Sequence, residues 1–425
     1  MIAQIANLEI VVIGYFVHIM CRTIFVKTKN QKNMGGYKVR KEFLPYCKPT
    51  QGQEEKDAVC KVIDSGMLTT GKVTAEFEKK FAEYVGAKHA IAVSSCTDAL
   101  HLSLIAAGIG PGDEVITTPI TFISTAAVIE WVGAKPVFVD IEERTYNINV
   151  DLIEDVITDK TKAIMPVHIA GLPCFMNSIQ KIAKKHGLKV IEDAAHAVGA
   201  VYKGKKIGSI GDISCFSFYA TKNLGIGEGG MITTDDYLLS ERLRKLRYLG
   251  INNEALGRYE KKGPWDYDVE ILGYKCNPPD LLMAIGLEQL KKLPEFQKRR
   301  KEIAYRYKER LKGWGLILPP EFNSNNPEEH FEHAWHIYPV QLPEGVDRSK
   351  FVKDMRNLNI GLSVHFKPMH MHSYFKKKYG DEVCYPIAER VYSRFVTLPL
   401  YPRMTDEDVD DVIEAVKKCL GENND

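Results

Sequence analysis

The sequence predicts an α/β protein with a mostly parallel central sheet, helices on both faces of that sheet, and a smaller C-terminal α+β domain. Its 425 residues exceed the length of one typical domain. Up to residue 290, short apolar segments alternate with amphipathic helical segments, which is typical of βαβ units. After residue 290 this alternation stops and a long charged helix follows.

We therefore expect three segments: residues 1–33 as an N-terminal extension outside the fold, residues 34–290 as a large domain, and residues 291–425 as a small domain. Residues 5–26 are mostly apolar but include Glu9, His18 and Arg22, so they are marginal as a membrane helix. An anchor and an upstream extension both remain open, and the extension is favoured because Met34 begins a stretch that resembles a natural start.

The secondary-structure elements follow from apolar periodicity and from glycines that punctuate it. Gly66 and Gly86 each end an amphipathic segment, as expected of helix C-caps. The predicted helices are 54–65, 74–85, 97–108, 124–133, 151–157, 178–187, 291–311, 348–358 and 406–419. The predicted strands of the sheet are 90–95, 114–118, 136–141, 162–169, 189–193, 213–219 and 230–236.

Charge and cysteine content exclude some classes of protein. The net charge is only +2, from 57 basic and 55 acidic residues, so no basic stripe for nucleic acid is indicated. The nine cysteines are scattered and include no C-x-x-C pair. This usage is typical of reduced thiols and predicts a cytoplasmic protein without a disulfide framework.

Ligands of doubly wound sheets bind beyond the carboxyl ends of the strands, so the residues that follow each strand are the candidates for function. In "SSCTDALHL" (94–102), hydroxyl residues lie between a strand and a helix start. Such a start offers free N–H groups that suit a phosphate. A plain N-cap by Ser95 or Thr97 explains the same residues, and both interpretations stay open.

Two further strand ends bear titratable side chains. Asp193 follows an apolar strand, where its carboxylate could hold a protonated ring nitrogen or could serve as a helix cap, and His196 lies one helical turn further on. Lys222 follows "CFSFY", and a lysine amine at a ligand edge can form a Schiff base with an aldehyde cofactor. A helix start that can bind a phosphate, a carboxylate that can hold a ring nitrogen and a lysine that can form an imine are the three groups that pyridoxal 5′-phosphate needs. Together they indicate this cofactor.

Gly225, Gly227 and Gly230 match G-x-G-x-x-G, the dinucleotide fingerprint, but in the wrong context. That fingerprint opens a helix, whereas these glycines precede "MITT", a predicted strand. We expect them to let the backbone turn tightly beside the cofactor and begin that strand.

With these residues in place, the sequence resembles the DegT-like sugar-nucleotide aminotransferases, pyridoxal-phosphate enzymes of fold type I. The likeness extends from about Phe43 to Leu420 and includes "SGMLTTGKV", "SSCTDALHL", "VIEDAAHAVGA", "CFSFYATKN", "GEGGMITT" and "VHFKPMH". It implies that Lys222 binds the cofactor and moves the proton during transfer. Other residues implied to hold the cofactor are Cys96, Thr97 and Ser217 at the phosphate, Phe122 on the ring, Asp193 at the ring nitrogen, and His196 at the phenolic oxygen.

The resemblance also implies substrates and a partner. The amino group would come from L-glutamate, which leaves as 2-oxoglutarate, and would go to a nucleotide-linked keto-sugar. "KNLGIGEGG" is most similar to the branch that acts at C4 of UDP-4-keto-sugars. Asn277 matches a residue that reaches the neighbouring subunit's site in relatives, which implies a homodimer. Residues implied to line the sugar and nucleotide side are Tyr46, Met67, Thr69, Thr70, His365 and Lys367. The chain departs from relatives at Gly225, Ile226, Pro278 and Pro279.

Three other functions have less support from the residues. A sugar dehydratase of this fold would have histidine in place of Lys222, and a non-catalytic sensor would not need Lys222, Asp193 and Thr97 together. His330, His333 and His336 suggest a zinc site by composition. Because "HAWHIYPV" is predicted to be a loop entering a strand, its side chains alternate between faces, and we expect no metal there.

Overall fold

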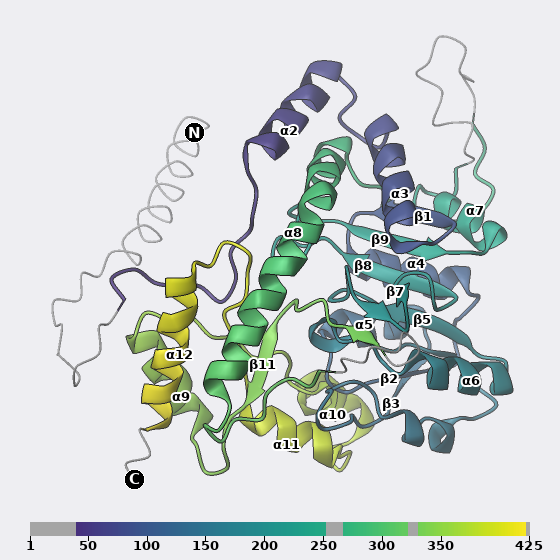
Figure 1. Ribbon diagram of the computed structural model, residues 1–425. Coiled ribbons are helices and arrows are strands. Elements are labelled where there is room, and N and C mark those ends of the chain that lie inside the picture. The colour runs from purple at the N-terminus through teal and green to yellow at the C-terminus, as the bar shows by residue number, and fades with distance from the viewer. Residues whose placement is uncertain (1–39, 252–266, 322–329, 422–425) are drawn as a thin grey trace, which may run out of the picture. The chain divides into compact units, whose positions relative to one another are not determined.

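The computed structural model describes residues 40–251, 267–321 and 330–421 (Figure 1). The chain divides into two compact units, residues 1–41 and 42–425, and every helix and strand in the described ranges belongs to the second unit. The predicted extension 1–33, with its apolar stretch 5–26, lies outside the described residues. No helix in the described ranges is long and apolar enough to cross a membrane.

A seven-stranded sheet forms the centre of the second unit and confirms the predicted fold class. The strand order is β1-β9-β8-β5-β4-β2-β3. β9 runs in the direction opposite to the other six strands, so the sheet is mostly parallel. All seven predicted strands are present, and their bounds are β1 His89–Val93, β2 Glu114–Thr117, β3 Lys135–Phe138, β4 Thr161–Ile164, β5 Lys189–Asp193, β8 Ile213–Ser217 and β9 Gly230–Thr234.

Helices cover both faces of this sheet because its strands are apolar on both sides. In β1, Ala90 and Ala92 pack into one buried cluster, while Ile91 and Val93 pack into another. The first cluster contains side chains from α3 (Lys72–Val85), α6 (Met176–His186) and α8 (Asp280–Leu311). The second contains side chains from α4 (Cys96–Ala106), α5 (Ile123–Trp131) and α7 (Tyr237–Leu246). This double burial is characteristic of parallel sheets.

Two predicted helices were wrong in extent or type. Residues 151–157 form two short 3₁₀ turns, Val150–Leu152 and Glu154–Val156, instead of an α-helix. So short a segment is a poor α-helix, and the Asn149 side chain accepts a hydrogen bond from Asp151 N, which favours the tight turn.

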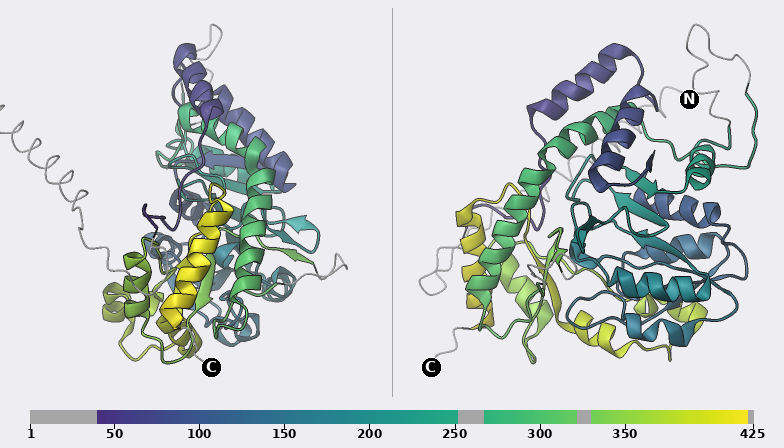
Figure 2. Two further views of the ribbon diagram at one scale, coloured as in Figure 1. Left: turned by 60° about the vertical axis from the view of Figure 1, so that its left-hand side comes forward. Right: turned by 45° about the vertical axis from the view of Figure 1, so that its right-hand side comes forward.

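The helix predicted to begin at residue 291 begins at Asp280, directly after its N-cap Pro279. Residues 280–290 are mostly apolar because Met283 belongs to the first buried cluster and Leu282, Ile285, Leu287 and Leu290 pack against it. Charged residues become frequent after Leu290. In Figures 1 and 2, α8 runs beside α2 (Gln53–Ser65) and α3 at one end and beside α12 (Asp406–Leu420) at the other. The predicted domain boundary at 290 therefore falls inside one continuous helix.

The C-terminal part surrounds a two-stranded antiparallel sheet of β11 (Tyr338–Gln341) and β12 (Phe395–Leu398). Helices α9 (Arg348–Asn357) and α12 pack together, and α12 also packs on α8. The remaining elements are β6 Val201–Tyr202, β7 Lys205–Lys206, β10 Phe331–Glu332, α10 Ser373–Tyr379 and α11 Pro386–Arg394.

Candidate active site

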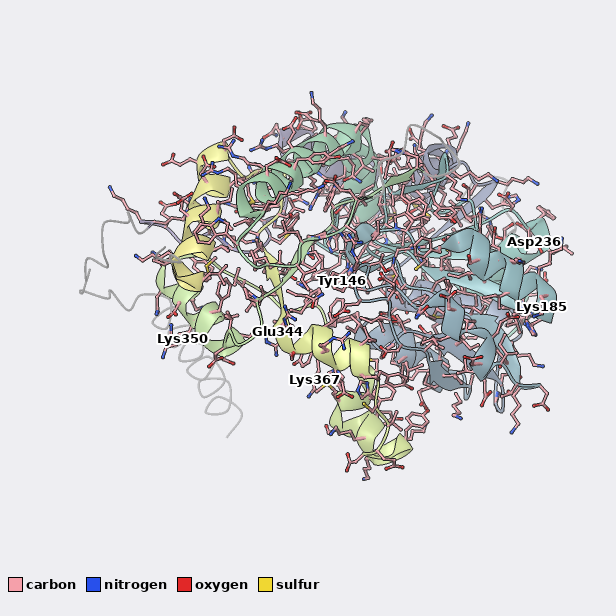
Figure 3. All side chains as sticks on the ribbon, turned by 60° about the horizontal axis from the view of Figure 1, so that its bottom comes forward. Tyr146, Lys185, Asp236, Glu344, Lys350 and Lys367 are labelled. Carbon is pink, nitrogen blue, oxygen red and sulfur yellow. The ribbon has the colours of Figure 1, made fainter. Side chains whose placement is uncertain are left out.

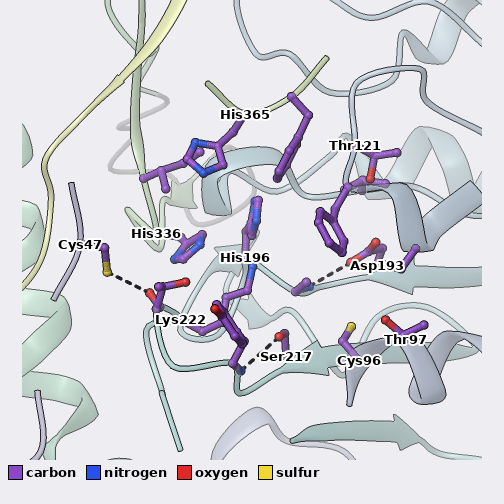
Figure 4. Close-up of a pocket in the computed structure, with 18 of the residues that line it drawn as sticks. Cys47, Cys96, Thr97, Thr121, Asp193, His196, Ser217, Lys222, His336 and His365 are labelled. Atoms are coloured by element: carbon purple, nitrogen blue, oxygen red, sulfur yellow. Dashed lines mark hydrogen bonds between the residues drawn. The ribbon is translucent and has the colours of Figure 1, made fainter. Parts of the chain in front are cut away.

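A cavity of about 460 Å³ lies at the carboxyl ends of the parallel strands, where the sequence predicted a ligand (Figure 4). Residues from the sheet edge line it together with residues from the N-terminal segment and the C-terminal part. The predicted site residues that line this cavity are Tyr46, Cys96, Thr97, Phe122, Asp193, His196, Ser217, Lys222 and His365.

One end of the cavity is formed by the N-terminus of α4. The Ser95 side chain caps the helix by accepting a hydrogen bond from Asp98 N at 3.0 Å, so the N-cap interpretation is correct. The first helical bond runs from Ala99 N to Ser95 O. The N–H groups of Cys96 and Thr97 precede that bond and remain available to an anion beside the Ser217 hydroxyl. The same helix start can therefore have Ser95 as its N-cap and still bind an anion through the N–H groups of Cys96 and Thr97.

Gly230 lets this helix end approach the sheet. A Cβ on Gly230 would lie 2.5 Å from Ser95 O and 2.8 Å from Cys96 N. The sequence prediction that Gly230 begins a strand is confirmed, since β9 starts at this residue. Gly227 has φ +106°, a conformation that favours glycine. The dinucleotide hypothesis therefore fails on structure as well as on context.

The exchange Gly230→Ala is expected to lower the free energy of unfolding by about 1–3 kcal/mol, because the added methyl group displaces the start of α4. It should also weaken the retention of phosphate-containing ligands. Urea unfolding of the cofactor-free protein and a binding titration with pyridoxal phosphate measure the two effects. Gly110→Ala is the matched control, since the nearest atom to its Cβ lies 3.9 Å away. Equal stability of both variants would contradict the close approach of helix and sheet.

Asp193 ends β5 and is held by two donors. Its Oδ2 accepts a hydrogen bond from Thr125 Oγ1 at 2.7 Å, and its Oδ1 accepts one from Ala195 N at 3.1 Å. The Thr125 hydroxyl is itself 2.7 Å from that of Thr121. Burial raises the pKa of Asp193, and these hydrogen bonds partly oppose that effect. The side chain is thus fixed in the wall of the cavity.

Lys222 lies in the loop between β8 and β9, and its side chain reaches the same cavity. Its backbone N–H donates to Tyr219 O at 2.8 Å, which closes the turn. Burial lowers the pKa of Lys222 to about 8, against the opposing influence of Cys96 and Asp193. At pH 7 about a tenth of this lysine is therefore the neutral amine, which is the nucleophilic form.

Three imidazoles form one side of the cavity: His196, His336 and His365 (Figure 4). The ring centroids of His196 and His336 are 4.4 Å apart, and Phe366 stacks on His196 at 5.9 Å. Burial, then the charge of Lys222, lowers the pKa of His365 to about 4 and those of the other two imidazoles well below the usual value. This wall is therefore uncharged.

The other predicted site residues do not line this cavity. Met67 and Thr69 are exposed, as is Lys367 (Figure 3). Thr70 and Asn277 lie together, with Asn277 Nδ2 donating to Thr70 Oγ1 at 2.7 Å. The Thr70 hydroxyl in turn donates to Pro278 O at 2.5 Å. These residues form a separate polar unit within one chain.

The three histidines that suggested a zinc site have other partners. His330 Nε2 is 3.2 Å from Glu332 Oε1, the His333 ring stacks on Trp335, and His336 faces the cavity. In the part of the chain that the structure describes, no group of three or more His, Cys, Asp or Glu side chains could hold a metal ion.

Sequence reasoning missed several residues of the site. Thr125 holds Asp193 although it is far away in sequence, and its spacing of four from Thr121 was the only local signal. The sequence suggested His336 only as a metal ligand. Further lining residues that it did not indicate are Cys47, Ser124, Glu228 and Phe366.

Comparison with known proteins agrees with this geometry. The chain is 50% identical to the spore coat polysaccharide biosynthesis protein SpsC of Bacillus subtilis over 386 residues, 90% of this chain and 98% of SpsC. The solved structure of Spr1654 from Streptococcus pneumoniae in its PMP form superposes with a TM-score of 0.83 at 32% identity, covering 89% of this chain and 99% of that one. Spr1654 has also been solved in a PLP form.

Helicobacter pylori PseC, an aminotransferase involved in the biosynthesis of pseudoaminic acid, superposes with a TM-score of 0.80 at 31% identity. That match covers 89% of this chain and 99% of PseC. Residues 49–417, which include every residue of the cavity except Tyr46 and Cys47, match one family throughout. The chain belongs to the DegT/DnrJ/EryC1/StrS aminotransferase family.

Proposed function

We propose that this sugar aminotransferase uses pyridoxal 5′-phosphate to move the amino group of L-glutamate to the C4 keto group of a UDP-linked sugar. The observation that supports it best is the cavity in which Lys222, Asp193 and the start of α4 meet. The solved PLP and PMP forms of Spr1654 are the two cofactor states that an amino transfer alternates between.

The residues of the cavity fit this cofactor. The anion seat of Cys96, Thr97 and Ser217 suits its phosphate, because Gly230 leaves no side chain in the way. The Asp193 carboxylate would hold the ring nitrogen, and His196 would hydrogen-bond to the phenolic oxygen. The exposed ring of Phe122 would cover one face. When bound, the cofactor supplies an electron sink and a carrier for the amino group.

Lys222 supplies the proton movement. With a pKa of about 8, it can accept a proton as an amine and return it as an ammonium at the same pH. The uncharged imidazole wall adds no positive charge that would oppose protonation of Lys222. Asp193, held by Thr125, contributes a negative charge that favours the ammonium form of Lys222.

The finer assignments rest on sequence motifs and on relatives. "KNLGIGEGG" favours the C4 branch and a UDP-linked substrate. The names of SpsC and PseC refer to the biosynthesis of spore coat polysaccharide and of pseudoaminic acid, which supports a role in making a surface sugar.

A second copy of the chain would complete the site. Thr70 and Asn277 are bonded to each other but do not line their own chain's cavity. Next to Thr70 in sequence, Met67 and Leu68 are exposed by 41% and 46%, and a partner subunit would cover them. We infer a homodimer in which each chain presents this unit to its partner's cavity.

An absorbance scan tests the proposal. Purified protein with pyridoxal phosphate is expected to show the visible band of the lysine-bound cofactor, and L-glutamate should bleach it. Adding 2-oxoglutarate should restore the band, whereas L-aspartate should act poorly. Bleached protein is then mixed with UDP- and dTDP-linked 4-keto-sugars. Cofactor binding without any response to glutamate would show that the donor is wrong or that the chain is a sensor.

A further inference from the structure

Two threonine hydroxyls lie one behind the other at the Asp193 carboxylate (Figure 4). Thr125 Oγ1 donates to Asp193 Oδ2 at 2.7 Å, and Thr121 Oγ1 is 2.7 Å from Thr125 Oγ1. A hydroxyl has one proton to donate, and Thr125 gives that proton to the carboxylate. Thr121 must therefore be the donor in the bond between the two threonines. We call these two hydroxyls, which donate in the order Thr121, Thr125, Asp193, the hydroxyl relay.

The start of α5 brings the relay together. Thr121 directly precedes Phe122, the N-cap of this helix, and Thr125 lies in its first turn. The backbone N–H of Thr125 donates to Phe122 O at 3.2 Å, which fixes that turn. No side chain caps the helix, and the start of a helix has a partial positive charge that favours an anion beside it. The position of Thr125 therefore also favours Asp193 as a carboxylate.

The relay is enclosed by the protein. Thr121 and Thr125 have no exposed surface, and Asp193 is 4% exposed. Solvent therefore screens these bonds little, and each bond acts on the charge of the carboxylate more strongly than it would at the surface. Burial raises the pKa of Asp193, and the bond from Thr125 is the largest of the influences that oppose this effect.

We propose that Thr121 is a positioning residue for Asp193: acting through Thr125, it keeps this side chain ionised and aimed into the cavity. The bond that Thr121 donates polarises the Thr125 hydroxyl and so strengthens the bond that this hydroxyl donates to Asp193. A carboxylate stabilised in this way is a weaker base and leaves a shared proton on the group that it contacts. The inference rests on the proposed function only in naming that group as the ring nitrogen of the cofactor.

A third buried threonine supplies the matched control. Thr118 has no exposed surface and lies in the same connection between β2 and α5. Its hydroxyl oxygen, unlike that of Thr121, has no hydrogen-bond partner among the described residues. Thr118→Val therefore makes the same chemical change as Thr121→Val without breaking a bond to another side chain.

Four further variants test the relay itself. Valine has nearly the shape of threonine but no hydroxyl, so Thr121→Val, Thr125→Val and the double variant remove the relay one bond at a time. Serine retains the hydroxyl, so Thr121→Ser is the conservative rescue. A role of Thr121 in packing alone would not distinguish Thr121→Val from Thr118→Val.

The readout is the pKa of Asp193 in cofactor-free protein, followed by infrared difference spectroscopy of its protonated carboxyl group as the pH is lowered. Asp193→Asn lacks this group and identifies its contribution to the spectra. The titratable groups around Asp193 are the same in all of the threonine variants: Cys96, His168, Cys174, Glu192, His196, Cys215, Lys222 and Glu228.

In Thr125→Val the pKa of Asp193 is expected to rise by about one to two pH units, because a hydrogen bond to the charged form is lost. In Thr121→Val it should rise by about a third of a unit, since polarisation by a second bond adds only a fraction of a bond. The double variant should match Thr125→Val, because Thr121 then has no hydroxyl through which to act. Thr121→Ser and Thr118→Val should keep the wild-type pKa.

An unchanged pKa of Asp193 in Thr121→Val would overturn the inference. A shift in the double variant equal to the sum of the two single shifts would also overturn it, because Thr121 would then act without Thr125. An equal rise in Thr118→Val and Thr121→Val would show that packing, and not the relay, sets this pKa. If wild type binds no pyridoxal phosphate, the proposed function fails, while the infrared titration still decides the inference.

Discussion

Lys222→Ala is expected to abolish amino transfer, lowering turnover at least about a thousandfold. Lys222 is the one amine among the side chains that line the described cavity, and burial lowers its pKa to about 8. Without it, no lining group combines nucleophilic attack with proton uptake at the same position. The variant should bind pyridoxal phosphate only non-covalently, without the visible band of the lysine-bound form.

Single-turnover absorbance with L-glutamate measures this loss. Lys181→Ala, an exposed lysine on α6, is the control and should keep wild-type rates. A small primary amine such as methylamine should restore part of the proton transfer, because it can occupy the space the side chain leaves. Retention of more than about a tenth of wild-type turnover in Lys222→Ala is incompatible with the proposed role, because a tenfold loss corresponds to only about 1.4 kcal/mol of activation free energy.

Asp193→Asn is expected to lower turnover without lowering the stability of the fold. In asparagine the amide oxygen can accept the Ala195 N–H, and the amide nitrogen can donate to Thr125 Oγ1, whose hydroxyl can then donate to Thr121, so the side chain stays in place. It cannot supply the negative charge that keeps a ring nitrogen protonated. Turnover should fall by about a hundredfold to a thousandfold, the scale of losing one electrostatic contact to the reacting centre. Cofactor binding itself should persist, because the phosphate seat is untouched.

The stability of the cofactor-free protein should move the other way. Burial raises the pKa of Asp193, so the folded protein binds that proton more readily than the unfolded chain. The stability that this group contributes is present at low pH and is lost as pH rises from the usual pKa through the folded one. At neutral pH the buried carboxylate is therefore destabilising, and Asp193→Asn should unfold at the same temperature as wild type or higher.

Thermal unfolding of cofactor-free protein, paired with turnover of the loaded enzyme, measures both effects. Thr125→Val is the companion variant: it removes one hydrogen bond to Asp193 but leaves the charge, so its turnover should lie between wild type and Asp193→Asn. If Asp193→Asn is clearly less stable than wild type, Asp193 serves the fold more than the reaction. Full turnover in that variant contradicts the assignment directly.

Local patterns were sufficient to predict the strands, most helices and the ligand edge of this protein. Apolar runs of strand length between amphipathic segments predicted all seven strands, because burial on both faces leaves few alternatives. The strand ends then predicted that Asp193, His196 and Lys222 share one edge, since parallel strands end together, and the cavity contains all three. The strand after Gly230 excluded the dinucleotide site from sequence alone.

Contacts between distant segments decided the rest. The start of α8 at Asp280 was hidden because residues 280–290 are mostly apolar, and only their packing on the first buried cluster shows why. The short turns at 150–156 depend on a local cap that competes with the helix. The donor that holds Asp193 comes from a residue 68 positions earlier, and Asn223, whose side-chain oxygen is 3.1 Å from His336 Nδ1, lies 113 positions before that histidine.

Sequence by itself thus determined the fold class, the family and the choice of Lys222 as the proposed reactive lysine, because these depend on periodicity and on motifs within short segments. Only the tertiary structure decided the support of Asp193, the place of His336 in the cavity wall, and the separation of Thr70 and Asn277 from their own cavity. The physical reason is that a proton's position and a carboxylate's charge depend on hydrogen-bond partners and burial. Folding brings the hydrogen-bond partners together from distant segments, and no local sequence pattern shows that these segments will meet.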